Sequence, residues 1–146
     1  MKALIELEIV NNEVVSAKVI KTEKKIQDVT SMYARFFDEG CPSWNKDPAY
    51  NKLFLKMHQD YANDLLKSRG HLFLNEVYDM LGIPRTREGA CVGWIYDEAN
   101  PVGDNFVDFD LLSTRNQRFI NGETNVALLD FNVDGCILDH VNEKES

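Results

Sequence analysis

Residues 47–70 read DPAYNKLFLKMHQDYANDLLKSRG and predict one long amphipathic helix. Asp47 supplies an acceptor at the N-cap, and Pro48 suits the first helical position because that position needs no backbone N–H donor. Gly70 is a residue type that commonly ends a helix. The apolar residues in between recur at helical spacing, so we expect them to face the core. They are Tyr50, Leu53, Phe54, Met57, Tyr61 and Leu65.

Upstream of this helix, alternating apolar residues predict a β-hairpin over residues 3–20. A three-residue loop, Asn11-Asn12-Glu13, keeps the two apolar faces opposite one another. From Ile26 the apolar period becomes helical, which predicts a helix that Gly40 and Pro42 end. The apolar stripe of that helix is Ile26, Val29, Tyr33, Phe36 and Phe37.

Downstream of Gly70, a helix over Leu72–Leu81 is predicted, ended by Gly82 and Pro84. Strand signals then return, and Asp134-Gly135 predicts a tight turn between the last two strands. The expected elements are strands at 90–96, 106–112, 126–133 and 136–138, a loop at 97–105 and a short helix at 113–120. The order ββ-ααα-ββ-α-ββ predicts an α+β fold with a largely antiparallel sheet and about three main helices.

One domain is expected over residues 1–146, a length that suits a single core. We interpret 1–70 as the hairpin plus amphipathic helices, 71–140 as an acidic module and 141–146 as a frayed tail. Composition is that of a soluble globular protein, with 44% hydrophobic and 27% charged residues. No membrane span or signal peptide is recognisable, and three widely spaced cysteines argue against disulfides, so a cytosolic location is expected.

The acidic residues lie mostly in the second half of the chain. Residues 71–146 hold fourteen Asp or Glu against five Lys or Arg, whereas residues 1–70 hold ten against eleven. Such an imbalance predicts a negative field that repels nucleic acid and membrane phosphates and attracts basic protein surfaces. We therefore expect a protein partner, and neither nucleic acid nor membrane.

Metal binding has two weak signals. Residues 130–135, DFNVDG, match the start of a calcium-binding EF-hand loop, but Val141 stands where the bidentate Glu belongs. A hairpin with Asp130, Asn132 and Asp134 facing outward is the preferred interpretation. Cys136 and His140 lack the paired spacing of zinc ligands. No metal and no cofactor are expected.

Catalytic signatures are also absent. No nucleophile elbow or phosphate-binding glycine loop is present, and His71 has no nucleophile marked beside it. Asp108 and Asp110 share a predicted strand face about 7 Å apart, which suits acid–base chemistry as well as a solvated acidic surface. We expect a protein that is not an enzyme.

Aromatic residues flank the acidic loop at 97–105 and suggest a surface for a basic protein partner. Whether the aromatics are core or interface stays open at this point. The expected contact residues are Asp97, Glu98, Asp104, Asp108, Asp110, Trp94 and Tyr96.

Three blocks of the second half resemble a known module. They are FLNEVYDMLG from Phe73, VGWIYDEANPVGDNFVDF from Val92 and LLDFNVDG from Leu128. Over residues 71–139 they are similar to a domain of unknown function in phage and prophage proteins of Gram-positive bacteria. The resemblance implies an accessory protein acting in the host cytosol, and no catalytic residue carries over from it.

From charge and resemblance together, we expect a non-enzymatic protein that binds a host protein, such as an acidic inhibitor of a CRISPR-type defence nuclease. The alternatives are a small-molecule- or metal-binding module, with a pocket walled by Trp94, Tyr96 and Phe109, and a structural or scaffolding protein of the phage.

Overall fold

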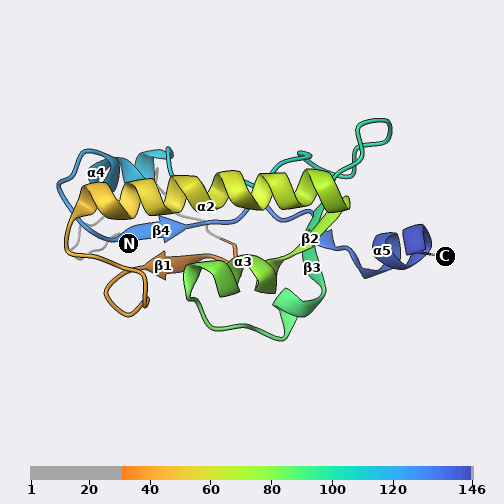
Figure 1. Cartoon of the computed structure of the whole chain (residues 1–146), viewed down its shortest axis with the longest axis horizontal. Helices are drawn as coiled ribbons and strands as arrows, with labels where there is room; N and C mark the ends of the chain where they lie inside the picture. The colour runs from red at the N-terminus through yellow and green to blue at the C-terminus, as the bar shows by residue number, and fades with distance from the viewer. Residues whose placement is uncertain (1–30, 146) are drawn as a thin grey trace, which may run out of the picture. The chain divides into compact units, whose positions relative to one another are not determined.

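A computed structural model describes residues 31–145 of the chain, which belong almost entirely to one compact unit that starts at Tyr33. The hairpin predicted over 3–20 lies outside the described residues, as does the start of the helix predicted from Ile26. Within this unit helices combine with two small antiparallel sheets, which confirms the α+β class (Figure 1). The single domain over 1–146 stays a prediction.

The long helix α2 (Pro48–Arg69) has the predicted bounds. The Asp47 side chain accepts a hydrogen bond from the backbone N–H of Ala49, and Gly70 closes the helix in the left-handed region at φ 86°. The predicted inward face is only partly right, since of its six residues Phe54 and Leu65 pack against the core. The buried residues are Asn51, Leu55, Ala62 and Leu66, whereas Tyr50, Leu53, Met57 and Tyr61 are exposed.

The segment before α2 is a strand where a helix was predicted. β1 (Arg35–Phe37) pairs antiparallel with β4 (Ala127–Leu129), and Phe36 lies opposite Leu128. Alternation in the strand buries Phe37 fully and leaves Phe36 exposed. Non-local pairing with β4 thus overrides the helical spacing of Phe36 and Phe37 with the residues before them.

The second sheet has the order β2-β3-β5. β2 (His71–Phe73) begins directly after the Gly70 cap and pairs with β3 (Val92–Ile95), which pairs in turn with β5 (Gly135–Cys136). The helix that was predicted from Leu72 therefore begins only after β2, as α3 (Leu74–Leu81). All four residues of β3 are buried, so this central strand belongs to the interior.

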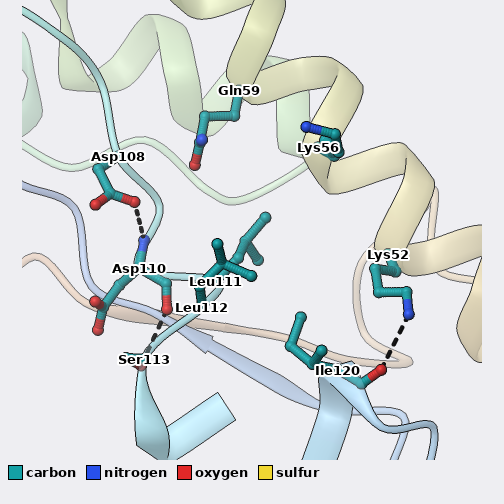
Figure 2. A pocket seen from close by; sticks show the side chains of 9 residues that line it. All are labelled: Lys52, Lys56, Gln59, Asp108, Asp110, Leu111, Leu112, Ser113 and Ile120. Atoms are coloured by element: carbon teal, nitrogen blue, oxygen red, sulfur yellow. Dashed lines mark hydrogen bonds between the residues drawn. The ribbon is translucent and has the colours of Figure 1, made fainter. Parts of the chain in front are cut away.

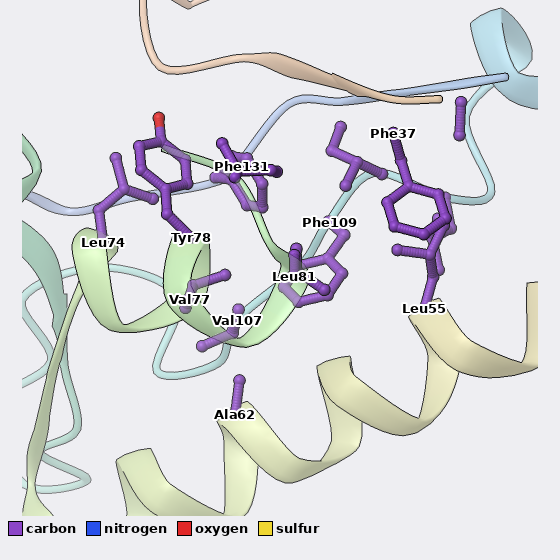
Figure 3. Close-up of a cluster of buried hydrophobic side chains, with 14 of the residues drawn as sticks. Phe37, Leu55, Ala62, Leu74, Val77, Tyr78, Leu81, Val107, Phe109 and Phe131 are labelled. Carbon is purple, nitrogen blue, oxygen red and sulfur yellow. The ribbon is translucent and has the colours of Figure 1, made fainter. Parts of the chain in front are cut away.

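The core lies between α2, α3 and the chain that follows β3. α3 is strongly amphipathic, and its buried residues include Leu74, Val77, Tyr78 and Leu81, as predicted (Figure 3). Phe131 packs edge-on against both Tyr78 and Phe109, with ring centroids 5.7 and 5.4 Å apart. Such edge-to-face pairs add to the stabilisation from apolar burial.

Three further predictions in the second half are corrected, and one is confirmed. Residues 106–112 form no strand, and the predicted hairpin at Asp134-Gly135 does not exist because β4 and β5 pair with different partners. The C-terminal segment is helical, as α5 (Leu138–Glu145), where a strand end and a frayed tail were expected. The short helix after Ser113 is present as a 3-10 turn (Thr114–Asn116) and α4 (Gln117–Ile120).

Side-chain amides provide much of the backbone pairing that longer strands would otherwise provide. An Asn side chain can pair with both the N–H and the C=O of one distant residue, as a neighbouring strand would. Asn116 pairs in this way with Leu128, through bonds of 2.9 and 2.8 Å. Four other pairs share this geometry: Asn51 with Asn45, Asn63 with Val107, Asn75 with Thr86 and Asn105 with Asp97.

These amides explain why residues 106–112 alternate in burial without forming a strand. Val107, Phe109 and Leu111 are buried, as the predicted strand would have them. The backbone N–H groups of Val107 and Phe109 donate to side chains of α2, and not to the backbone of a neighbouring strand. Asn63 accepts from Val107 N–H at 2.7 Å, and Gln59 accepts from Phe109 N–H at 2.8 Å.

Candidate functional site

The predicted contact surface centres on residues 97–105, called the acidic loop from here on. The loop is closed at its base by Asn105, whose amide accepts from Asp97 N–H at 3.0 Å and donates to Asp97 C=O at 3.2 Å. Asn105 has φ 65°, a conformation that Asn tolerates better than most residues. The tip, residues 98–104, is exposed and projects from the body near the C-terminal end of α2 (Figure 1).

Further hydrogen bonds hold the two ends of the loop. The Asp97 carboxylate accepts from the N–H groups of Ala99 and Asn100, at 3.2 and 3.1 Å. At the other end, Asn132 donates to the Asp104 carboxylate at 3.0 Å and to the Phe106 carbonyl at 2.9 Å. The loop is therefore held at both ends.

The EF-hand-like motif proves to be part of this anchoring. Asp134 accepts from Ile95 N–H at 2.9 Å and packs against Gly103, where a larger residue would clash with its carboxylate. Asp130 lies 3.6 Å from Arg115. The three polar side chains are thus half-buried and bonded to other segments, not turned outward as predicted. Within residues 31–145, no three His, Cys, Asp or Glu residues group as metal ligands would.

The two aromatic residues predicted to contact a partner have different positions. Trp94 is fully buried, and its indole N–H donates to Asn132 at 2.9 Å. Its ring belongs to the core, so a partner on the surface cannot reach it. Tyr96 is half-buried, and its hydroxyl donates to Glu98 at 2.7 Å. Phe106 is exposed beside the acidic loop.

The five predicted carboxylates form two groups. Asp97, Glu98 and Asp104 belong to the acidic loop, whereas Asp108 and Asp110 lie in the segment that runs alongside α2. The Asp108 carboxylate accepts from Asp110 N–H at 2.8 Å, and Asp110 has φ 65°, a conformation that Asp, like Asn, tolerates better than most residues. Burial, opposed by the Ser113 hydrogen bond and the nearby Arg115, raises the pKa of Asp110.

Burial likewise raises the pKa of Asp134, although the Ile95 N–H favours its charged form. For Tyr96, the hydrogen bond to Glu98 raises the pKa of the phenol. Burial and the anchoring contacts together account for these shifts.

A cleft of about 570 Å³ opens between α2 and residues 108–113 (Figure 2). Its apolar wall consists of Leu111, Leu112 and Ile120, and Lys56 and Gln59 project from α2 above it. Lys52, at one end, donates to the Ile120 carbonyl at 3.0 Å. The pocket expected from Trp94, Tyr96 and Phe109 is not this one, since Trp94 and Phe109 are core residues.

Sequence reasoning missed the amides that build both sites. Asn132, Asn105, Asn63 and Gln59 position the acidic loop and one wall of the cleft. One sequence signal was present, because Asn51 and Asn63 interrupt the same face of α2 that carries Leu55, Ala62 and Leu66. A polar side chain on an otherwise buried face must find partners.

The fold and the loop define a small α+β protein whose most distinctive site is an anchored, acidic surface loop. Residues 2–141 match a family of unknown function, DUF6353, and the chain belongs to this family. No curated protein and no solved structure matches the chain. Among the helices that the structure describes, none has both the length and the apolar composition of a membrane span.

Proposed function

We propose that the chain acts without catalysis, by binding a protein with a basic surface, and that the acidic loop is its contact. The observation that carries the proposal is the closure of the loop by Asn105 and Asn132. A loop already held in one conformation loses little conformational entropy when it binds, so more of its interaction energy contributes to affinity.

Charge determines the kind of partner. From Tyr96 to Asp110 the chain has five carboxylates and no Lys or Arg, so this surface attracts basic groups. Asp97 and Asp104 hold the loop itself, which leaves Glu98 as the exposed carboxylate best placed for contact. Exposed Val102 and Phe106 supply the apolar area that a protein interface also needs.

We extend the proposal to the biological source of the protein and to its target. The protein is an accessory factor of a phage or prophage of Gram-positive bacteria, acts in the host cytosol, and binds a defence nuclease of the CRISPR type. Its carboxylates then occupy the basic channel that otherwise holds nucleic-acid phosphates. The support is the resemblance of residues 71–139 and the excess of acidic residues there.

Changes of charge at the loop tip test the proposal. Glu98→Lys and Val102→Lys leave the anchors at Asp97, Asn105 and Asn132 in place, although Glu98→Lys also removes the acceptor of the Tyr96 hydroxyl. Glu123→Lys is a matched control at an exposed carboxylate outside the loop. We expect a basic host protein to bind the wild type and Glu123→Lys, and to bind the two loop variants at least tenfold more weakly. Raising the salt to about 0.5 M is expected to weaken wild-type binding.

For the nuclease, the measurement is DNA cleavage by a purified CRISPR nuclease from a Gram-positive host, with increasing amounts of each variant. Inhibition by the wild type that Glu98→Lys loses supports the nuclease as target. Binding that is insensitive to both loop variants overturns the loop as contact, and full cleavage at all concentrations overturns the nuclease as target.

The cleft favours a second candidate function, the binding of a small molecule. Its volume lies within the range of about 300–1,000 Å³ that is typical of ligand sites, and an apolar wall with a few polar groups is the usual lining. The Lys56 ammonium lies on one side and the Asp108 and Asp110 carboxylates on the other, which suits a small zwitterion with an apolar middle.

Native mass spectrometry of the purified chain tests this second function. A bound small molecule that Lys56→Glu releases, and that Lys67→Glu on the same helix retains, supports the cleft as its site. A chain that carries no added mass and shows no thermal shift with a panel of amino acids and betaines contradicts it.

A further inference from the structure

Four of the six apolar residues that the sequence assigns to the core form a stripe on the exposed face of α2. Relative exposures are 46% for Tyr50, 58% for Leu53, 57% for Met57 and 53% for Tyr61. Spacings of three and four residues place all four on one side of the helix, over a length of about 17 Å. A continuous row of large exposed apolar side chains is typical of an interaction surface and not of a solvated helix face.

Charged residues beside the stripe are arranged asymmetrically along the helix. Lys56 lies on its N-terminal side, whereas Asp60 and Asp64 lie on its C-terminal side, each four residues after the previous one. All three are exposed, and successive residues at this spacing form a row beside Leu53, Met57 and Tyr61. The row therefore changes sign close to the middle of the stripe.

This pattern is complementary to itself when two helices meet antiparallel. A two-fold axis that passes near Met57, perpendicular to both helices, brings Leu53 of one copy opposite Tyr61 of the other. The same rotation brings Lys56 opposite Asp60 on the same flank of the contact. A parallel two-fold arrangement would instead place the two charged rows on opposite flanks of the contact, where they cannot pair. A two-fold contact of this kind uses one surface patch on both copies.

We propose that the outer face of α2 binds the same face of a second copy of this chain, antiparallel and centred near Met57. This dimer is independent of the acidic loop and of the cleft's apolar wall. One helix pair buries less than the roughly 1,200–2,000 Å² of a standard stable interface. We therefore expect a dissociation constant in the micromolar range, measurable by analytical ultracentrifugation of the full chain.

Charge exchange between two variants provides the sharpest test. Lys56→Glu places a carboxylate opposite Asp60, and Asp60→Lys places an ammonium opposite Lys56. Each variant alone should therefore dimerise at least tenfold more weakly than wild type. Mixed in equal amounts, the two variants should form a heterodimer, because both pairs then join opposite charges. The double variant Lys56→Glu/Asp60→Lys should dimerise with itself again. A variant that simply failed to fold would recover neither in the mixture nor in the double variant.

Cross-linking tests the position of the axis. In a Cys91→Ser/Cys136→Ser background, which leaves only buried Cys41, Met57→Cys should form a disulfide-linked dimer under mild oxidation. Leu138→Cys, at an exposed site in α5, should not. A chain that stays monomeric up to about 1 mM, with no heterodimer from the mixed variants, overturns the proposal. So does a dimer that Leu53→Lys and the charge variants leave unchanged.

Discussion

The indole N–H of Trp94 donates a hydrogen bond of 2.9 Å to Oδ1 of Asn132. The same oxygen accepts from Asp108 N–H at 2.7 Å, while the amide nitrogen donates to the Asp104 carboxylate and the Phe106 carbonyl. One side chain therefore joins β3, the acidic loop and the segment that runs alongside α2. Buried polar groups of this kind stabilise only when every member has a partner.

Asn132→Asp tests this junction. The carboxylate can still accept from Trp94, but it cannot donate to Phe106, and it brings a second negative charge beside Asp104. We expect the free energy of unfolding to fall by about 2–3 kcal/mol in urea titrations. Asn121→Asp is the control, because exposed Asn121 only accepts from Gln117 and a change within about 0.5 kcal/mol is expected. Equal stability of the two variants would contradict the role of Asn132.

Asn116→Asp tests whether the amide pairs replace strand pairing. Asn116 is 2% exposed, and its amide nitrogen donates to the carbonyls of Asp110 and Leu128. The substitution loses both donations and buries a charge, so we expect a loss of about 3 kcal/mol or more. Hydrogen exchange should become faster across β4 as a whole, because the new carboxylate can still accept from Leu128 N–H itself. Unchanged exchange there would show that β4 does not depend on Asn116.

Gly93→Ala tests the close approach of β2 to β3. A Cβ atom at Gly93 would overlap the Leu72 carbonyl and touch the Phe73 backbone, neither of which can rotate away. We expect a loss of about 2–3 kcal/mol in the free energy of unfolding, with a lower melting temperature. Gly40→Ala is the comparison, because its Cβ would meet only the flexible Asp38 carboxylate, at 3.2 Å. A native-like melting temperature for Gly93→Ala would mean that the strands can separate without cost.

The ionisation of Glu76 should make the free energy of unfolding depend on pH. Burial raises the pKa of Glu76, but the hydrogen bonds from Arg69 and Phe73 N–H outweigh it and lower the pKa below its ordinary value of 4.5. A lowered pKa stabilises the folded protein above pH 4.5, and this contribution is lost as the pH falls through the folded pKa.

We therefore expect Glu76→Gln to reduce the free energy of unfolding by about 0.5–1 kcal/mol at pH 7, with a difference from wild type that shrinks below pH 4.5. Urea titrations across that pH range measure it. Glu123→Gln is the control, since its pair with Arg118 is more exposed and has a longer separation of 3.6 Å. A difference that persists unchanged at low pH would exclude the charge as its cause.

The acidic loop was located correctly from the sequence, but the means by which it is held was not. Asp97, Glu98 and Asp104 stand out because they are concentrated and lack nearby basic residues. The partners that anchor them, Asn105 and Asn132, carry no such signal. Asn132 lies 28 residues from Asp104, and no local pattern indicates that the two meet.

The sequence by itself determined where α2 begins and ends and where α3 ends. Asp47, Pro48 and Gly70 delimit α2, and Gly82 ends α3, because capping depends on hydrogen bonds and backbone conformations within a few residues. Only the tertiary structure decided which face of α2 is buried, since Tyr50 to Tyr61 and Asn51 to Leu66 both have helical spacing. The polar members of the second face become acceptable in the core only when distant residues, such as Asn125 for Asn51 and Val107 for Asn63, complete their hydrogen bonds.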